Sequence, residues 1–247
     1  MPRSTTSHRA ASTRNTATGA ERAKPRRPRA TGPAAHQVRI IGGEWKRTPL
    51  AVIDAEGLRP TPDRVRETLF NWLATEINGA RCLDLFAGTG ALGFEAASRG
   101  AARVLMIERN PRAAMQLKAM KAKLSTQKVE IAEADALRLG NNLEAASFDF
   151  VFLDPPFDSN LLAKALPIAA RLCTPYGAIY VESSVALQVE AIAEGEKPGK
   201  GAKPGDEIID PALLAAWEGL RTAGWQITRQ GRAGAVHYHL LRRETDE

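Results

Sequence analysis

The chain has 247 residues, of which 44% are hydrophobic and 25% charged, and its formal net charge is +6 at pH 7. These fractions are typical of folded globular proteins, so we expect a packed core. No apolar run approaches the roughly 18 residues that span a bilayer, and the first residues lack the apolar segment of a secretory signal, so we expect neither a membrane protein nor a secreted one. Two cysteines are too few for a disulfide framework or a cysteine-rich zinc site, which fits a reducing, cytoplasmic compartment.

The positive charge is concentrated at the N-terminus. Residues 1–35 carry eight basic side chains and one acidic one, which leaves 26 basic and 27 acidic side chains for the other 212 residues. Because the segment also lacks large apolar residues apart from its first methionine, we predict a disordered basic tail over residues 1–36. Such a tail attracts nucleic acid through counterion release, or is a dispensable solvated extension. A mitochondrial transit peptide is disfavoured, because Pro25, Pro28 and Pro33 would break its helix.

Residues 37–78 are predicted to form a small hairpin and a helix. Residues 38–41 alternate as a strand does, and the glycine pair that follows permits a turn. Thr61 as N-cap and Pro62 as first helical residue are typical of a helix start, and the apolar spacing that follows predicts a packed helix up to residue 73. The basic side chains of this region are candidate contacts for a polyanionic partner: Arg39, Lys46, Arg47, Arg59, Arg64 and Arg66.

From residue 79 onward, apolar segments alternate with helix-like ones. Strands are predicted at 82–86, 104–107, 129–132, 148–153 and 178–181, with helices between them at 91–99, 111–124, 136–145 and 160–173. This alternation predicts an α/β fold with a doubly wound, mostly parallel sheet covered by helices on both faces. Strands at 225–228 and 236–241, joined by a turn at 230–234, predict a final antiparallel hairpin. The composition of residues 194–207 predicts a flexible loop.

A glycine-rich turn follows the first strand of this region. Gly88, Gly90 and Gly93 satisfy G-x-G-x-x-G between a strand and a helix, the context in which this motif binds adenosine-containing cofactors. Glu108 ends the next strand, where a carboxylate can bond both ribose hydroxyls. The predicted cofactor-binding residues are Asp84, Phe86, Ala87, Gly88, Gly90, Glu108, Asp135 and Ala136.

Asp84 discriminates among the cofactors that such a turn binds. A carboxylate before the turn suits the ammonium group of S-adenosyl-L-methionine, directly or through water, and would repel the pyrophosphate of NAD or FAD. Asp135 follows the third strand, where its carboxylate can accept a hydrogen bond from the adenine amino group. We therefore predict S-adenosyl-L-methionine as the cofactor and disfavour a nicotinamide oxidoreductase.

The most specific motif is the run that ends the fourth strand, whose predicted catalytic residues are Asp154, Pro155, Pro156 and Phe157. The two prolines lack N–H donors and hold the backbone carbonyls rigid. Methyl transfer to an exocyclic amine needs acceptors for both amino hydrogens, because the nitrogen lone pair must leave conjugation before it attacks. The Asp154 carboxylate and the Pro155 carbonyl can supply them. Phe157 offers a ring on which a flipped-out base can stack.

Taken together, the motifs resemble those of the bacterial 16S rRNA guanine-N2 methyltransferases that modify guanine 966 of the small subunit. The resemblance runs from about residue 37 to residue 243 and rests on residues 39–43, 58–73, 84–93, 154–157 and 180–182. It implies a seven-stranded, Rossmann-like methyltransferase domain over residues 79–247, with the small N-terminal hairpin and helix beside it. It also implies 16S rRNA, in the small ribosomal subunit or its assembly intermediate, as the partner that the basic residues contact. We expect a monomer without a metal ion; the long tail and the 194–207 loop depart from the family pattern.

Other functions remain open at this stage. A DNA adenine-N6 or cytosine-N4 methyltransferase shares the Asp-Pro-Pro-aromatic motif, but only 90 residues follow Phe157, which leaves little room for a separate target-recognition region. A non-catalytic RNA-binding assembly factor would need neither an intact motif nor a complete cofactor turn. Cys82 and Cys173 are predicted core residues. His237 and His239 share one face of the last strand without a third ligand, so they do not predict a metal site.

Overall fold

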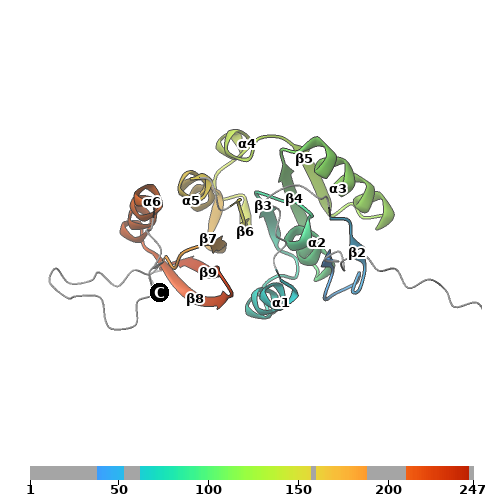
Figure 1. The fold of residues 1–247 in the computed structure, drawn as a ribbon, viewed down its shortest axis with the longest axis horizontal. Helices are drawn as coiled ribbons and strands as arrows, with labels where there is room; N and C mark the ends of the chain where they lie inside the picture. Colours follow the sequence, from blue (N-terminus) through green and yellow to red (C-terminus); the bar gives the residue numbers. More distant parts are fainter. Residues whose placement is uncertain (1–37, 53–61, 157–159, 188–209, 245–247) are drawn as a thin grey trace, which may run out of the picture. The chain divides into compact units, whose positions relative to one another are not determined.

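The computed structural model describes residues 38–52, 62–156, 160–187 and 210–244. Seven strands form its central sheet: β3 (Arg81–Asp84), β4 (Arg103–Glu108), β5 (Val129–Glu133), β6 (Phe148–Leu153), β7 (Cys173–Ser183), β8 (Trp225–Ala233) and β9 (Val236–Arg243). Their order across the sheet is β5-β4-β3-β6-β7-β9-β8 (Figure 1). The strands from β5 to β7 are parallel, whereas β9 is antiparallel to both β7 and β8. The predicted mostly parallel sheet with a final antiparallel hairpin is therefore confirmed.

Two layers of helices cover the sheet, one on each face. The described helices are α1 (Asp63–Trp72), α2 (Ala91–Ser98), α3 (Pro111–Lys123), α4 (Ala136–Asn142), α5 (Leu161–Leu172) and α6 (Pro211–Thr222). Side chains of α1, α2 and α3 pack into one apolar cluster, and those of α4, α5 and α6 pack into another (Figure 1). None of these helices combines the length and apolarity that a bilayer crossing requires.

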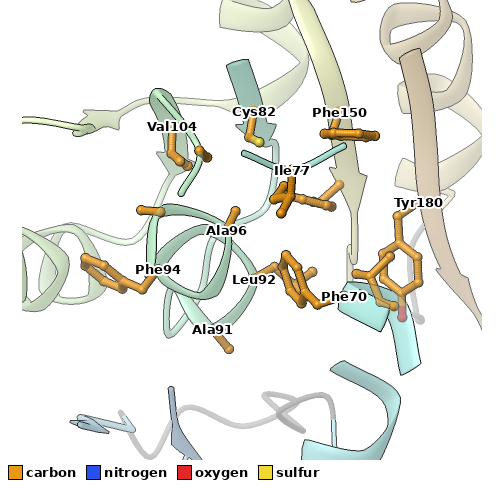
Figure 2. Packing of buried hydrophobic residues seen from close by; sticks show 14 of the residues in the cluster. Phe70, Ile77, Cys82, Ala91, Leu92, Phe94, Ala96, Val104, Phe150 and Tyr180 are labelled. Atoms are coloured by element: carbon orange, nitrogen blue, oxygen red, sulfur yellow. The ribbon is translucent and has the colours of Figure 1, made fainter. Parts of the chain in front are cut away.

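Alternation along the buried strands sends side chains into both clusters. Cys82 and Phe150 face the α1–α3 side, whereas the adjacent Leu83 and Val151 face the α4–α6 side. Figure 2 shows Cys82 and Phe150 together with Tyr180 of β7 in the first cluster. Because successive strand residues point to opposite faces, apolar runs such as β6 fill both layers at once.

The N-terminal hairpin packs against helix α2. Its strands β1 (Val38–Arg39) and β2 (Pro49–Leu50) pair antiparallel, and their apolar side chains join the α1–α3 cluster. The Ile41 N–H donates to the buried carboxylate of Glu95 at 2.7 Å, and the Ser98 hydroxyl donates to the Gly42 carbonyl at 2.6 Å. The hairpin is thus fixed to the helix that begins at the glycine turn.

Several boundaries differ from the sequence prediction. Strand β7 begins at 173 rather than 178, and β8 continues to 233, so the turn of the last hairpin lies at Gly234 rather than over 230–234. A register shift between Ile227 and Arg229 interrupts the alternation of β8, which explains why the prediction ended that strand early. Helix α6 was not predicted. Helix α1 begins at Asp63, with Pro62 and not Thr61 at the N-cap position.

Some predicted features lie outside the described residues. They are the tail over 1–36, Arg59, Thr61, Phe157 and the loop over 194–207.

Candidate functional site

A pocket opens at the carboxyl ends of the parallel strands β3, β4, β5 and β6. It holds about 900 Å³ of empty space, part of which is open to solvent. Open α/β sheets bind their ligands in this crevice. Eight of the predicted site residues line it: Phe86, Gly88, Glu108, Asp135, Ala136, Asp154, Pro155 and Pro156. Apolar side chains that sequence reasoning missed complete the walls, among them Leu85, Ile107, Leu137 and Leu161.

The glycine turn needs its glycines for backbone conformation and for space. Gly88 and Gly90 have φ angles of 51° and 75°, the left-handed region that glycine enters without strain. A Cβ on Gly93 would lie 2.5 Å from the side chain of Met106, so this position allows α2 to pack closely on β4. Ala87 is buried and donates its N–H to the Ile107 carbonyl at 2.9 Å. Ala87 and Gly90 therefore shape the turn without lining the pocket.

Asp84 is buried beneath the glycine turn and binds its backbone. Its side chain is only 2% exposed, and its Oδ2 accepts a hydrogen bond from the Gly93 N–H at 3.0 Å. The pKa of Asp84 is raised to about 7: burial, and to a smaller extent the charges of Asp154 and Glu108, raise it, whereas the backbone hydrogen bonds from Gly93 and Phe86 lower it. Asp84 is not among the pocket-lining residues, so the visible role of this carboxyl is to hold the turn to the start of α2.

Substituting Asp84 with Asn should change how stability depends on pH. In an unfolded chain an aspartate titrates near pKa ~3.9, so the folded protein binds an extra proton between about pH 4 and pH 7. The stability contributed by this group is fully present below about pH 4 and is lost as pH rises to about 7. Between about pH 5 and pH 8, the free energy of unfolding should therefore fall by roughly 3 kcal/mol less in Asp84→Asn than in the wild type. The variant keeps an acceptor for the Gly93 N–H, and urea unfolding at the two pH values measures both losses. Equal losses in the two proteins would contradict the assignment.

Glu108 links the glycine turn to the end of β4. Its Oε2 accepts from the Gly88 N–H at 2.8 Å, and its Oε1 accepts from the Asn110 N–H at 2.6 Å. These two bonds fix the half-buried carboxylate at the pocket wall, beside the turn. Asp135 is fixed in a different way, because its Oδ1 caps helix α4 by accepting from the Arg138 N–H at 2.9 Å. Both carboxylates thus face the same pocket from neighbouring strand ends.

Asp154 and the prolines form the side of the pocket at the end of β6. Asp154 is half-buried, Pro155 is buried and Pro156 is exposed. Leu153 of β6 pairs with Val181 of β7, so the residues that follow them, Asp154 and Glu182, lie side by side at the carboxyl edge of the sheet. Glu182 is buried and accepts a hydrogen bond from the Tyr180 hydroxyl at 2.9 Å. A second, buried carboxylate therefore lies next in the sheet to the predicted catalytic one.

Four of the candidate RNA-contacting residues are exposed, and one is not. Arg39, Lys46, Arg47 and Arg64 have exposed side chains. Arg66 is fully buried, so its side chain does not lie where the predicted polyanionic partner could contact it.

The burial of Arg66 follows from its polar partners. Its guanidinium donates to the Arg39 carbonyl at 2.8 Å and to Asp63 Oδ1 at 2.6 Å, and lies 3.7 Å from Glu95 Oε2. Burial lowers the pKa of Arg66, but the charges of Asp63, Glu95 and Glu182 oppose that effect. Arg66 therefore joins the N-terminal hairpin to α1 and α2 and is not part of an RNA-contacting surface.

The tip of the N-terminal hairpin lies away from the pocket. The Glu44 and Trp45 N–H groups donate to the carbonyl and the hydroxyl of Ser98, the last residue of α2, at 2.8 and 2.9 Å. Helix α2 starts at the glycine turn and is about 12 Å long at 1.5 Å per residue. Lys46 and Arg47 therefore lie at the opposite end of α2 from the glycine turn.

Cys82, Cys173, His237 and His239 do not line this pocket. Cys82 and Cys173 are buried and free, as predicted for core residues, and burial raises the pKa of the Cys173 thiol to about 12. Within the described residues, no group of three or more His, Cys, Asp or Glu side chains is arranged to hold a metal ion.

Comparison with known proteins decides the family. The chain matches the family described as "Conserved hypothetical protein 95" over residues 38–203. It is 36% identical over 210 residues to ribosomal RNA small subunit methyltransferase D of Escherichia coli, which covers 84% of this chain and 91% of the relative. The chain belongs to this methyltransferase family. The Haemophilus influenzae relative of the same name is 45% identical over 152 residues, covering 60% of this chain and 79% of that protein.

A solved structure agrees with this membership. A protein from Escherichia coli superposes with a TM-score of 0.63 at 35% identity, covering 84% of this chain and 98% of that one. The resemblance drawn from the motifs is thus confirmed, and the fold is the Rossmann-like methyltransferase fold. The glycine turn, Glu108 and Asp154 occupy the carboxyl-end crevice of a methyltransferase domain.

Proposed function

We propose that this methyltransferase acts as a monomer and transfers a methyl group from S-adenosyl-L-methionine to the N2 amine of guanine 966 in 16S rRNA. The substrate is the small ribosomal subunit or its assembly intermediate. One observation carries the proposal: a single pocket joins Asp154 and Pro155 to the glycine turn and Glu108. The names of the relatives, ribosomal RNA small subunit methyltransferase D, support ribosomal RNA as the substrate class.

The pocket residues fit S-adenosyl-L-methionine. Glu108 presents a fixed carboxylate suited to ribose hydroxyls, and the exposed carboxylate of Asp135 at the same pocket suits an adenine amino group. Ile107 and Leu137 offer apolar surface for the adenine ring. When bound, S-adenosyl-L-methionine supplies a methyl group activated by a sulfonium.

The residues of the chain act mainly by accepting hydrogen bonds and stabilising charge. The Asp154 carboxylate and the Pro155 carbonyl accept the two amino hydrogens of the target base, which favours a tetrahedral nitrogen whose lone pair can attack. Positive charge develops on this amine, and the carboxylate of Asp154 stabilises it without acting as a strong base. Once the methyl group is on the nitrogen, the acidic methylated amine releases one proton to this carboxylate or to water. Holding the amine in line with the methyl group contributes the rest of the rate gain.

The proposed reaction is tested by locating the transferred methyl group. Small subunits are purified from bacteria that lack their own enzyme of this family, and they are incubated with the protein and labelled S-adenosyl-L-methionine. Mass spectrometry of 16S rRNA digests should place one methyl group on guanine N2 at position 966. Methylation of adenine N6, or of DNA offered in the same assay, would favour the DNA amino-methyltransferase. Absence of methyl transfer alongside tight subunit binding would favour the non-catalytic assembly factor.

Glu108→Ala should weaken cofactor binding far more than it slows the reaction. Loss of charge-assisted hydrogen bonds to the ribose is expected to raise the Kd for S-adenosyl-L-methionine about 10- to 100-fold. Glu108 lies at the end of β4, which β3 separates from β6 and its Asp154. The value of kcat at saturating cofactor should therefore remain close to wild type. Calorimetry and a cofactor titration of the rate measure the two effects separately. Glu108→Gln keeps an acceptor, so its Kd for the cofactor should fall between those of the wild type and Glu108→Ala. A large kcat defect that persists at saturating cofactor contradicts the assignment.

A further inference from the structure

The β8–β9 hairpin carries positive charge that neither the pocket nor the N-terminal hairpin accounts for. Residues 225–243 contain four arginines and two histidines and no aspartate or glutamate. The chain after residue 35 is close to neutral as a whole, with 26 basic and 27 acidic side chains including those of this hairpin. An acid-free segment of this length therefore makes a local positive potential that attracts polyanions.

Two of these arginines are exposed on β8 and keep their charge available. Arg232 lies next to the turn, and Arg229 lies three residues earlier, on the opposite face of the strand. The Arg229 guanidinium donates to the Thr228 carbonyl at 3.0 Å, and the Arg232 guanidinium donates to the Gly234 carbonyl at 2.9 Å. Among the described residues neither has a carboxylate within ion-pair distance. Arg81 and Arg103, at the start of their strands, differ in this respect, because Asp149 and Glu130 bind them at 3.0 and 2.8 Å.

The topology places this turn at the edge of the sheet that holds the pocket. Strand β9 runs antiparallel to β7, and His237 pairs with Ser183, the last residue of β7. The turn at Gly234 therefore lies beyond the carboxyl end of β7. Because β7 is parallel to β6, this is the same edge of the sheet as the end of β6, where Asp154 lies. A Cβ added to Gly234 would meet no atom within 4 Å, so the turn is open to an approaching partner.

The spacing suits a nucleic-acid strand whose target base lies at Asp154. Strand β8 is three positions from β6 in the sheet, which corresponds to about 14 Å at ~4.8 Å per strand. We propose that Arg229 and Arg232 bind phosphates of the RNA backbone that flank the target guanine, making the β8–β9 turn a docking surface for the substrate strand. This inference rests on the proposed function, because it takes RNA as the substrate. Such contacts fix the position of the strand and carry no base preference of their own.

Binding measurements on a charge-removing double variant test this surface. Arg229→Gln/Arg232→Gln and the wild type are titrated against small subunits that lack the modification, across a salt series. Each phosphate contact contributes about 0.7 to 0.9 to the slope of log affinity against log salt, which is roughly fivefold in affinity at 0.1 M salt. The double variant should bind about 10- to 30-fold more weakly at that salt, with a slope lower by about 1.5. Its Kd for S-adenosyl-L-methionine should equal that of the wild type.

Two controls separate a docking surface from a general effect of charge. Arg103→Gln removes one positive charge from an exposed arginine at the amino end of β4, on the side of the sheet away from the pocket. This variant should bind subunits as the wild type does. Arg229→Lys/Arg232→Lys keeps the charge and should keep most of the salt slope. The proposal is overturned if the Gln double variant matches the wild type, or if Arg103→Gln weakens binding as much. Binding requires no turnover, so failure of the proposed reaction would appear separately, as subunits that are bound and not methylated.

Discussion

Asp154→Ala is expected to abolish methyl transfer while leaving the affinity for S-adenosyl-L-methionine close to wild type. The carboxylate lies at the end of β6 and serves the target amine, whereas the ribose and the glycine turn depend on Glu108. Removing one preorganised electrostatic partner of a transition state typically lowers kcat by about 10²- to 10³-fold. The loss should be larger here, because truncation also removes the acceptor that orients the nitrogen lone pair.

The test of Asp154 compares activity and cofactor binding in the same preparations. Single-turnover methylation of small subunits gives the rate, and isothermal titration gives the Kd for the cofactor. Asp154→Asn is the matched variant, since it keeps the size and one acceptor oxygen but lacks the negative charge. We expect it to remain strongly impaired, because the amine becomes positive as it reacts. A variant that lost cofactor affinity in proportion to its activity would place Asp154 at the cofactor instead of the amine.

The pocket was largely predictable because its polar residues follow strands. Glu108 and Asp154 come directly after apolar runs, and Asp135 follows the strand at 129–132 by three residues. The carboxyl ends of parallel strands meet at one edge of the sheet, where all three residues line the pocket. The orientation of Asp84 was less accessible. Its place behind the turn depends on the closeness of α2 to β4, which a sequence shows only indirectly through Gly93. The apolar walls of the pocket carry no motif at all.

The burial of Arg66 and the presence of helix α6 were both missed, although the sequence contains patterns that indicate them. Arg66 precedes Phe70 by four residues and Leu73 by seven, so the spacing already placed it on the buried face of α1. Its charge led to the opposite interpretation, because arginine is usually exposed unless it is paired. Helix α6 has an Asp-Pro start at 210–211, with buried Leu213 and Trp217 four residues apart. The polar segment before it hid that pattern.

The strand errors arise from tertiary context. The first residues of β7 around Thr174 to Tyr176 are polar or exposed, so no apolar run marks the beginning of the strand. Likewise, the outer half of β8 is exposed on an edge and interrupted by a register shift. Pairing with β9, and not local preference, keeps that half in the sheet.

Arg66→Met is expected to lower the free energy of unfolding by about 3 to 5 kcal/mol. The substitution removes the cation that lies between Asp63 and the buried Glu95, and it leaves the Arg39 carbonyl without its donor at 2.8 Å. Breaking a buried ion pair costs about this much. Glu95 keeps the Arg99 guanidinium and the Ile41 N–H, each at 2.7 Å, so the loss should lie at the low end of this range. Urea unfolding of the variant and the wild type measures the loss.

The matched control is Arg64→Met, which changes an exposed arginine two residues earlier in the same helix and should alter stability by no more than about 0.5 kcal/mol. A double-mutant cycle with Glu95→Gln then isolates the electrostatic part. Since Glu95→Gln removes the carboxylate that loses one of its two arginine partners in Arg66→Met, the double variant should be less destabilised than the sum of the two single variants. Additive losses would mean that Arg66 stabilises the fold through Asp63, packing and its backbone hydrogen bond, and not through Glu95. Equal losses for Arg64→Met and Arg66→Met would contradict the buried position of Arg66, and would return it to the exposed surface that its charge first suggested.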